Sequence, residues 1–272
     1  MASGVWGYKV KPGEQPTSIA KAPSLPRILH ADAALLAMPS ASSSTLSLAF
    51  LIAGYLNARC TTAPNQASVP HGTDRVRFLT TIPSILSTHI SNLVVLYHAL
   101  VTLFWTSSPS DHEIIDRLCT YPDHLNAQRV TWNPRTVGYL SLLAVGAFIR
   151  LSAYGGLGRN FTFQLAKPDR LITSGVYRYL QHPSYTGIVL VLPSFAGLVV
   201  NRLDTPIACL IPGPLLALLR DWEIVLGAIA GAILVVSLTV RIRDEERMLR
   251  EKFGREWEEW HAKTARIVPG LF

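Results

Sequence analysis

Residues 175–187, Gly175-Val-Tyr-Arg-Tyr-Leu-Gln-His-Pro-Ser-Tyr-Thr-Gly187, form a polar motif that directly precedes a long apolar segment. A second polar motif, Arg241-Ile-Arg-Asp-Glu-Glu-Arg-Met-Leu-Arg-Glu-Lys-Phe-Gly254, follows another long apolar segment. Polar and ionisable side chains are costly beside membrane-length apolar segments, so they indicate functional sites. The two motifs therefore predict one polar site at the end of a membrane-embedded helical hairpin.

The composition is typical of an integral membrane protein. Of the 272 residues, 49% are hydrophobic and only 16% are charged, and several uncharged runs are long enough to span a bilayer. We expect an all-α fold: a polytopic transmembrane helical bundle of about five or more spans with a C-terminal cytosolic helical tail. The net charge of +7 is spread over loops, which favours a membrane lipid partner and no nucleic acid.

The chain divides into three parts: an N-terminal lead over 1–33, membrane helices with a polar loop over 34–133, and a core over 134–272 that holds both motifs. Membrane spans are expected at 35–56, 79–105, 136–158, 184–201 and 223–240. The serine-rich stretch Ser40–Thr45 is unfavourable for the first of these spans, and Arg150 interrupts the third. The short apolar segment 205–219 contains three prolines, so it is expected to be re-entrant or interfacial.

Membrane orientation follows from parity and charge. If His182 and Glu245 share a site, an even number of crossings separates them. The basic loop 159–182 favours the cytosol for that site. Counting back over five spans puts the N-terminus in the lumen, whereas the basic residues of the lead (Lys9, Lys11, Lys21 and Arg27) favour the cytosol, so the N-terminal topology stays open.

The three cysteines, Cys60, Cys119 and Cys209, are far apart and odd in number. They show neither metal-ligand spacing nor a disulfide framework, and no metal site is expected. The cysteines are therefore interpreted as packing residues.

The first motif predicts a helix that begins at His182-Pro183, because proline is favoured at the first helical position and restricts the residue before it. Free N–H groups at such an end suit an anionic ligand group. His182 and Tyr185 add a hydrogen-bond donor and an aromatic face. The same residues are also compatible with a simple helix cap.

The second motif predicts a helix that continues out of the membrane. Arg241 and Glu245 are four residues apart and share one helix face. Gly254 follows Phe253 as a helix-ending glycine. Trp257 and Trp260 are three residues apart, which suits a membrane interface or the wall of a ligand site.

Three elements in order resemble the isoprenylcysteine carboxyl methyltransferase family: Thr173-Ser-Gly-Val-Tyr177, then His-Pro-Ser-Tyr-x-Gly, then Arg241 with Glu245-Glu246-x-x-Leu249-x-x-x-Phe253-Gly254. The resemblance covers about residues 135–270. It implies a multi-pass enzyme of the endoplasmic reticulum membrane whose active site faces the cytosol. Such an enzyme uses S-adenosyl-L-methionine to methylate the prenylated C-terminal cysteine of processed C-a-a-X proteins.

The resemblance also implies roles for individual residues. The cofactor contacts would be Gln164, Asp169, Arg170, Leu171, Ile172, Tyr177, His182, Pro183, Ser184, Tyr185 and Glu245. Arg241 would hold the substrate carboxylate, and Arg241 and His182 would be the catalytic residues. The chain departs from the family pattern at Gln181, where arginine is usual, at Trp257 and Trp260, where tyrosines are usual, and in a longer hairpin over 202–222.

Three other functions remain compatible with the sequence. A phospholipid amine N-methyltransferase would share the cofactor motif, but its amine must lose a proton and Arg241 would repel a cationic substrate. A membrane reductase of sterol type would need nicotinamide-cofactor contacts that the sequence does not indicate. A non-catalytic membrane scaffold or transporter with a degenerate site is the non-enzyme alternative, which Gln181 keeps open.

Overall fold

The computed structural model describes residues 39–65, 82–105 and 113–268, all within one compact unit, Met38–Phe272. Within these ranges the chain forms α-helices and short 3-10 turns, and its single β-type contact is a parallel bridge between Leu180 and Ala265. The expected all-α fold is confirmed for this part of the chain. The N-terminal lead, with the basic residues that bear on its topology, lies outside the described residues.

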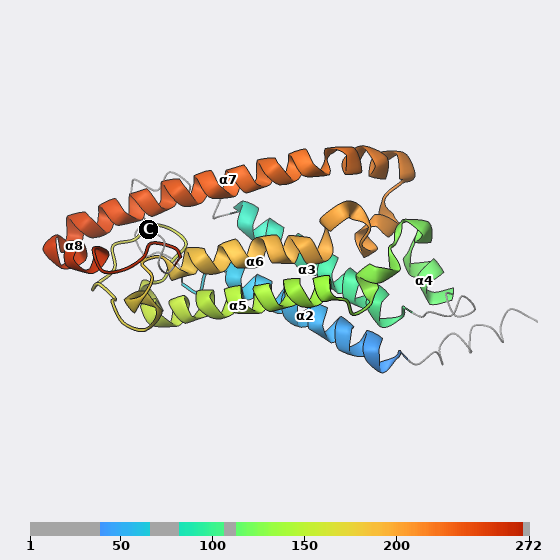
Figure 1. Ribbon diagram of the computed structural model, residues 1–272, viewed down its shortest axis with the longest axis horizontal. Helices are drawn as coiled ribbons and strands as arrows, with labels where there is room; N and C mark the ends of the chain where they lie inside the picture. The colour runs from blue at the N-terminus through green and yellow to red at the C-terminus, as the bar shows by residue number, and fades with distance from the viewer. Residues whose placement is uncertain (1–38, 66–81, 106–112, 269–272) are drawn as a thin grey trace, which may run out of the picture. The chain divides into compact units, whose positions relative to one another are not determined.

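The long helices are α2 (Ala41–Thr61), α3 (Ile82–Leu103), α5 (Pro134–Leu157), α6 (Pro183–Val199) and α7 (Gly213–Phe253), and the short ones are α4 (Glu113–Leu118) and α8 (Arg255–His261) (Figure 1). Three segments of the described chain are long and apolar enough to cross a membrane: Ile85–Leu103, Pro134–Asn160 and Gly213–Phe253. Helix α6 is apolar but shorter, at 17 residues.

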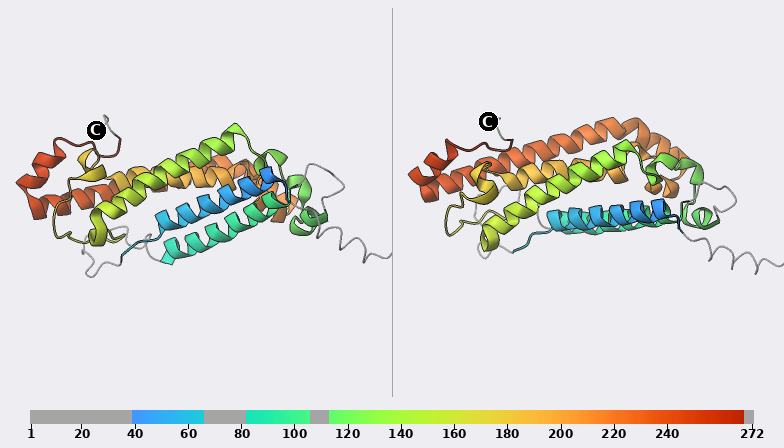
Figure 2. Two further views of the ribbon diagram at one scale, coloured as in Figure 1. Left: turned by 90° about the horizontal axis from the view of Figure 1, so that it is seen from below. Right: turned by 60° about the horizontal axis from the view of Figure 1, so that its bottom comes forward.

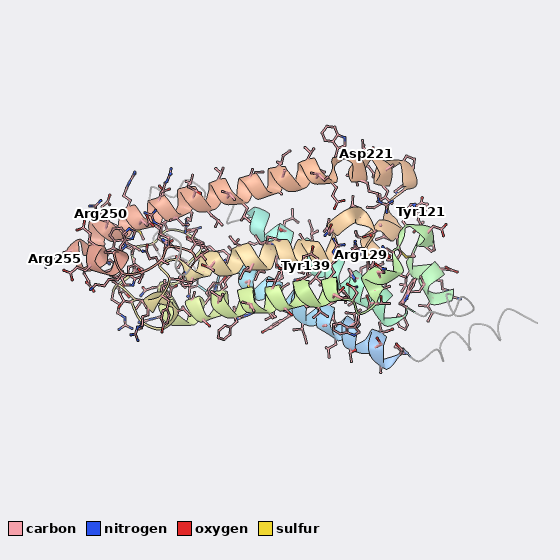
Figure 3. All side chains as sticks on the ribbon, viewed as in Figure 1. Tyr121, Arg129, Tyr139, Asp221, Arg250 and Arg255 are labelled. Atoms are coloured by element: carbon pink, nitrogen blue, oxygen red, sulfur yellow. A yellow bond between two sulfur atoms is a disulfide. The ribbon has the colours of Figure 1, made fainter. Side chains whose placement is uncertain are left out.

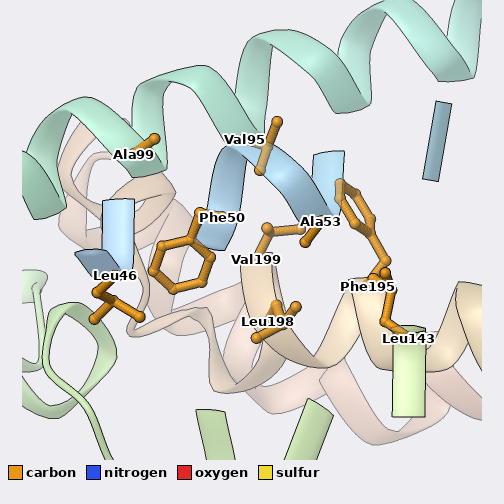
Figure 4. Packing of buried hydrophobic residues seen from close by; sticks show 9 residues of the cluster. All are labelled: Leu46, Phe50, Ala53, Val95, Ala99, Leu143, Phe195, Leu198 and Val199. Carbon is orange, nitrogen blue, oxygen red and sulfur yellow. The ribbon is translucent and has the colours of Figure 1, made fainter. Parts of the chain in front are cut away.

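Four helices share one apolar core. Figure 2 shows α2 and α3 side by side as a hairpin, next to the pair α5 and α6. The core consists of Leu46, Phe50 and Ala53 from α2, Val95 and Ala99 from α3, Leu143 from α5, and Phe195, Leu198 and Val199 from α6 (Figure 4). It fixes the positions of the helices that carry the first motif.

Helices α5 and α6 are in close contact at Gly146 and Gly187. A Cβ atom at Gly187 would lie 2.6 Å from Arg150 Cβ and 2.6 Å from the carbonyl oxygen of Gly146. Both distances are far below van der Waals contact, so only glycine fits at this crossing. Gly187 ends the first motif, and the close approach therefore places that motif against α5.

We predict that Gly187→Ala destabilises the protein by about 1–3 kcal/mol, the usual cost of overpacking a well-packed interior. Gly155→Ala on α5 is the matched control, because a Cβ there meets nothing within 4 Å. Thermal unfolding in detergent should show a lower Tm for Gly187→Ala and an equal or higher Tm for Gly155→Ala. Equal Tm values for the two variants would contradict the close-packed crossing.

Two helix starts differ from expectation. The serine-rich stretch does not weaken α2, because hydroxyl groups tie the helix to the end of α3: Ser43 Oγ donates to the Trp105 carbonyl (3.2 Å) and Ser47 Oγ to the Ala99 carbonyl (2.8 Å). The segment 205–219 is divided between two elements, and its re-entrant or interfacial placement in the membrane stays a prediction. Residues 206–210 form a 3-10 turn, and α7 already begins at Gly213 with a proline in its first turn, where proline is tolerated.

The interpretation of the cysteines is correct only for Cys60, which is a buried free thiol. Cys119, which follows α4, and Cys209, in the turn before α7, form a disulfide with their Cα atoms 4.8 Å apart. They are 90 residues apart in sequence, so spacing gave no sign of the pairing. In Figure 3, Tyr121 and Arg129 mark the end of the bundle that holds this disulfide, and Arg250 and Arg255 mark the opposite end.

We predict that Cys119→Ser lowers the free energy of unfolding by about 2–4 kcal/mol, since the disulfide closes a long loop. Cys60→Ala is the control for loss of a buried thiol outside any disulfide. In unfolded, unreduced protein a maleimide should label one cysteine of the wild type, and after reduction it should label three. Three reactive thiols before reduction would contradict the pairing.

Candidate active site

The two polar motifs meet at one end of the bundle, as the sequence predicts. Helix α6 begins with Pro183 at its first turn and His182 at the N-cap, and α7 returns to bring Glu245 beside them. Tyr185 Oη donates a hydrogen bond to Glu245 Oε2 (2.7 Å), and His182 Nδ1 lies 3.7 Å from the same oxygen. Two long helices, α6 and α7, separate His182 from Glu245 and return the chain to the same end of the bundle.

A cavity of about 440 Å³ opens between the motifs and the loop 158–182. Its wall contains most of the residues singled out from the sequence: Gln164, Arg170, Leu171, Ile172, Tyr177, His182, Ser184, Tyr185, Arg241 and Glu245. Two are not in the wall. Asp169 is exposed and its backbone N–H donates to Asn160 Oδ1 (3.3 Å), and Pro183 is fully buried at the start of α6.

The cavity has a polar part and an apolar part. The polar part lies at the ends of α6 and α7, where Arg241 and Glu245 are found. The apolar part continues along the two helices and is lined by Ile188 and Leu192 of α6 and by Ala230, Ile233, Leu234 and Leu238 of α7. One cavity can therefore hold a charged group and a hydrocarbon chain together.

Arg241 is buried, with 8% of its surface exposed. Its Nη2 donates to the Phe163 carbonyl (2.6 Å), and its Nε lies 3.4 Å from Tyr185 Oη. These contacts connect α7 to the loop 158–182 and to the first motif. They also fix the guanidinium group in the cavity wall, where it can bind a carboxylate through two parallel hydrogen bonds.

Glu245 supplies the negative charge of the polar part. Its side chain is 28% exposed, so the carboxylate is accessible to a ligand while it accepts the hydrogen bond from Tyr185. Burial raises the pKa of the Tyr177 phenol above its ordinary value, and the Glu245 carboxylate raises it further. Tyr177 therefore stays protonated and donates to the Ala153 carbonyl (3.3 Å).

Arg150 also lines the cavity, although its sequence position predicts only an interruption of the apolar span 136–158. It is buried in α5, where Nε donates to the Cys60 carbonyl (2.7 Å) and Nη1 donates to both the carbonyl and the hydroxyl of Ser184 (2.8 Å each). It thereby connects the end of α2 to the first turn of α6. A charged residue inside an apolar span is the signal that could have identified it.

The two tryptophans have different surroundings. Trp257 is buried with Leu165, Met248 and Leu249 in a small core. Trp260 lines the cavity, and its Nε1 donates to the Tyr177 carbonyl (3.0 Å). The alternative of a ligand wall therefore fits Trp260, whereas Trp257 is a packing residue.

Residues 139–221 match the model of the isoprenylcysteine carboxyl methyltransferase (ICMT) family. The family resemblance is confirmed. A probable protein-S-isoprenylcysteine O-methyltransferase of Oryza sativa subsp. indica is 30% identical over 142 residues, which are 51% of this chain and 62% of the relative. A protein-S-isoprenylcysteine O-methyltransferase of Schizosaccharomyces pombe is 28% identical over 134 residues, 48% of each chain.

Protein-S-isoprenylcysteine O-methyltransferase B of Arabidopsis thaliana is 27% identical over 135 residues, 48% of this chain and 57% of the relative. The chain thus matches between 48% and 62% of the length of these relatives.

The family match includes the first motif and α6, and it ends before Arg241 and Glu245. The contribution of the second motif therefore rests on the geometry of the cavity.

Proposed function

We propose that this protein uses S-adenosyl-L-methionine to methylate the C-terminal carboxylate of prenylated cysteine in processed C-a-a-X proteins. One observation carries the proposal: a single cavity joins a buried arginine and an accessible carboxylate to an apolar groove between the apolar helices α6 and α7. A prenylated cysteine has this same combination of a carboxylate and a hydrocarbon chain. The names of the relatives support the same activity.

The residues of the polar part fit the methyl donor. S-adenosyl-L-methionine carries two positive charges, on sulfur and on the amino group, and an aromatic base. Glu245 provides the opposite charge, and Tyr185, His182 and Trp260 provide ring surfaces in the same wall. The cavity volume lies in the ordinary range for small-molecule sites. When bound, the cofactor supplies a methyl group on a positively charged sulfur.

Gln164, Arg170, Leu171, Ile172, Tyr177 and Ser184 complete the proposed cofactor contacts within the same wall. The positions of Asp169 and Pro183 give them an indirect role, through the loop 158–182 and through the start of α6. We assign His182 to the catalytic residues, because its ring lies between Glu245 and Glu246 of α7. These assignments extend the family roles to this chain.

The chemistry needs positioning and no general base. An α-carboxyl group has a pKa of about 3.3–3.7 and is ionised near neutral pH. Arg241 orients its oxygen towards the methyl group, because a one-step transfer depends on alignment and close approach. If Arg241 stabilised the charge of the bound carboxylate too strongly in the ground state, the reaction would slow, since only preferential binding of the transition state accelerates it.

The apolar groove suits a prenyl chain. Each buried CH₂ group contributes about 0.8 kcal/mol, so the substrate partitions into the membrane and can enter between α6 and α7. The cofactor is polar and enters from the aqueous side. The polar part of the cavity lies where these two routes meet.

We place the protein in the endoplasmic reticulum membrane with five crossings, α2, α3, α5, α6 and α7, and with the cavity and the C-terminal helical segment facing the cytosol. Helix α2 has 21 residues, enough to span a bilayer core. The loop at the cavity end carries Arg159, Lys167, Arg170 and Arg178 against Asp169, which favours the cytosol. The disulfide at the opposite end suits an oxidising lumen.

The test is transfer of a labelled methyl group from S-adenosyl-L-methionine to N-acetyl-farnesylcysteine in membranes containing the protein, beside a His182→Ala variant. We expect activity in the wild type and its loss in the variant. If the protein binds the cofactor but transfers no methyl group to the prenylcysteine, an amine N-methyltransferase acting on lipid becomes the favoured function. If the protein neither transfers the methyl group nor binds the cofactor, the non-catalytic scaffold is the function that remains.

A further inference from the structure

The C-terminal segment 261–268, called here the strap, lies along the chain just before α6. The backbone N–H of Gln181 donates to the Ala265 carbonyl (2.8 Å), and that of His182 donates to the Arg266 carbonyl (3.0 Å). In the reverse direction, the N–H of Ala265 donates to the Tyr179 carbonyl (3.3 Å). The strap therefore binds the two backbone N–H groups that directly precede α6.

Gln181 fixes the strap in register. It is 5% exposed, and although it borders the cavity, its amide is bonded to the strap. Nε2 donates to the carbonyls of Thr264 (2.6 Å) and His261 (3.0 Å), and Oε1 accepts from His261 Nδ1 (2.8 Å). Partial burial lowers the pKa of His261 below its ordinary value, which favours the neutral ring for this bond.

This geometry accounts for the departure from the family pattern at Gln181. An amide offers both donors and an acceptor, whereas the usual arginine has donors only. An arginine here could reach the strap carbonyls but could not accept the hydrogen bond from His261. The neutral side chain therefore matches the strap of this particular chain.

Arg266 connects the strap to His182 through Glu246. Arg266 Nε lies 3.0 Å from Glu246 Oε1, and its Nη2 donates to Oε2 (3.2 Å). Glu246 Oε1 in turn lies 3.4 Å from His182 Nε2. The His182 ring is thus held between Glu246 on Nε2 and Glu245 near Nδ1, and the strap anchors the first of these glutamates.

We infer that the strap positions His182 and the start of α6 for binding of the methyl donor, with Gln181 and Arg266 as positioning residues. The inference rests on the proposed function, because it assigns the strap to the same cofactor site. Without the Gln181 amide or the Arg266 guanidinium group, the hydrogen-bond partners of the His182 ring and of the two N–H groups before α6 are no longer held in place. The donor must then order this region when it binds, which weakens its binding.

The test compares Gln181→Ala and Arg266→Ala with Arg255→Ala in the full-length protein. Arg255 is the matched control, because it lies on α8 with its side chain 90% exposed and pairs with Glu259. Equilibrium binding of labelled S-adenosyl-L-methionine gives Kd directly, and methyl transfer gives KM for both substrates. We expect Gln181→Ala to raise Kd for the donor about tenfold, the effect of losing one or two hydrogen bonds of a buried amide. Arg266→Ala should raise it by about two- to fivefold, because the Arg266 side chain is half exposed where it pairs with Glu246.

The KM for N-acetyl-farnesylcysteine should change by less than about twofold, Arg255→Ala should match the wild type, and Arg266→Lys should recover part of the affinity. An unchanged donor Kd in the folded fraction of both strap variants, even with a lower Tm, would reduce the strap to a structural role and overturn the inference. If the wild type binds the donor but methylates no prenylcysteine, the proposed function fails while the Kd comparison still decides the strap. If the wild type does not bind the donor, both are overturned.

Discussion

Arg241→Ala should lower kcat/KM for N-acetyl-farnesylcysteine by roughly a hundredfold, mainly through a higher KM for the prenylcysteine. A hydrogen-bonded pair with a charged group contributes about 1.5–3 kcal/mol, and the arginine lies 8% exposed in the cavity wall. In this setting water replaces the lost guanidinium group poorly. The measurement is steady-state methyl transfer with each substrate varied in turn.

The structure makes the comparison of the two KM values decisive for Arg241. Its Nη2 also donates to the Phe163 carbonyl, so its loss can loosen the loop that carries the proposed cofactor contacts. An equal rise in KM for prenylcysteine and for S-adenosyl-L-methionine would mean that Arg241 only supports this loop. Arg243→Ala is the control, because Arg243 is exposed on the same turn of α7. Arg241→Lys should restore only part of the activity, since lysine lacks the planar fork.

Glu245→Gln should raise Kd for S-adenosyl-L-methionine by about 10- to 50-fold. The amide has nearly the same shape as the carboxylate and can still accept the hydrogen bond from Tyr185, which is 2.7 Å long. The substitution therefore removes little besides the negative charge. A charged partner contributes about 1.5–3 kcal/mol, and the 28% exposure of the side chain favours the lower half of that range.

Equilibrium binding of labelled S-adenosyl-L-methionine measures this effect without any turnover. Glu258→Gln is the matched control, since Glu258 is 51% exposed and pairs with Arg250 on the surface. An affinity equal to that of the wild type in Glu245→Gln would remove the proposed role of this carboxylate. A comparable loss in Glu258→Gln would instead indicate a general electrostatic effect of the charged tail.

The site was more predictable from the sequence than the packing around it. His182-Pro183 marks a helix start because of the backbone restrictions of proline, and the structure places α6 there. The two apolar runs between the motifs, 184–201 and 223–240, predict an even number of crossings and therefore bring His182 and Glu245 to the same end. Several residues between Gln164 and Tyr185 line the cavity, because the long connection 158–182 lies against α7, where Arg241 donates to the Phe163 carbonyl.

Other features depend on contacts between segments that are distant in sequence. Proline signals alone could not separate a re-entrant turn from the first turn of α7, because proline is compatible with both. Gln181 stands out in the sequence only as a departure from a pattern, and its role becomes clear when the strap lies against it. Arg150 is visible as a charge within an apolar run, but its partners lie on α2 and α6.

The sequence by itself determined the helical membrane class, the start of α6 and the residue types of the polar site, because these follow from local backbone restrictions and from the length of apolar runs. Only the tertiary structure decided which distant groups meet: Cys119 with Cys209, Gly187 with α5, and Gln181 with His261. These pairings depend on helix lengths and crossings that bring together residues 80 and 90 positions apart. No local pattern encodes them, because each partner is compatible with many neighbours until the helices pack.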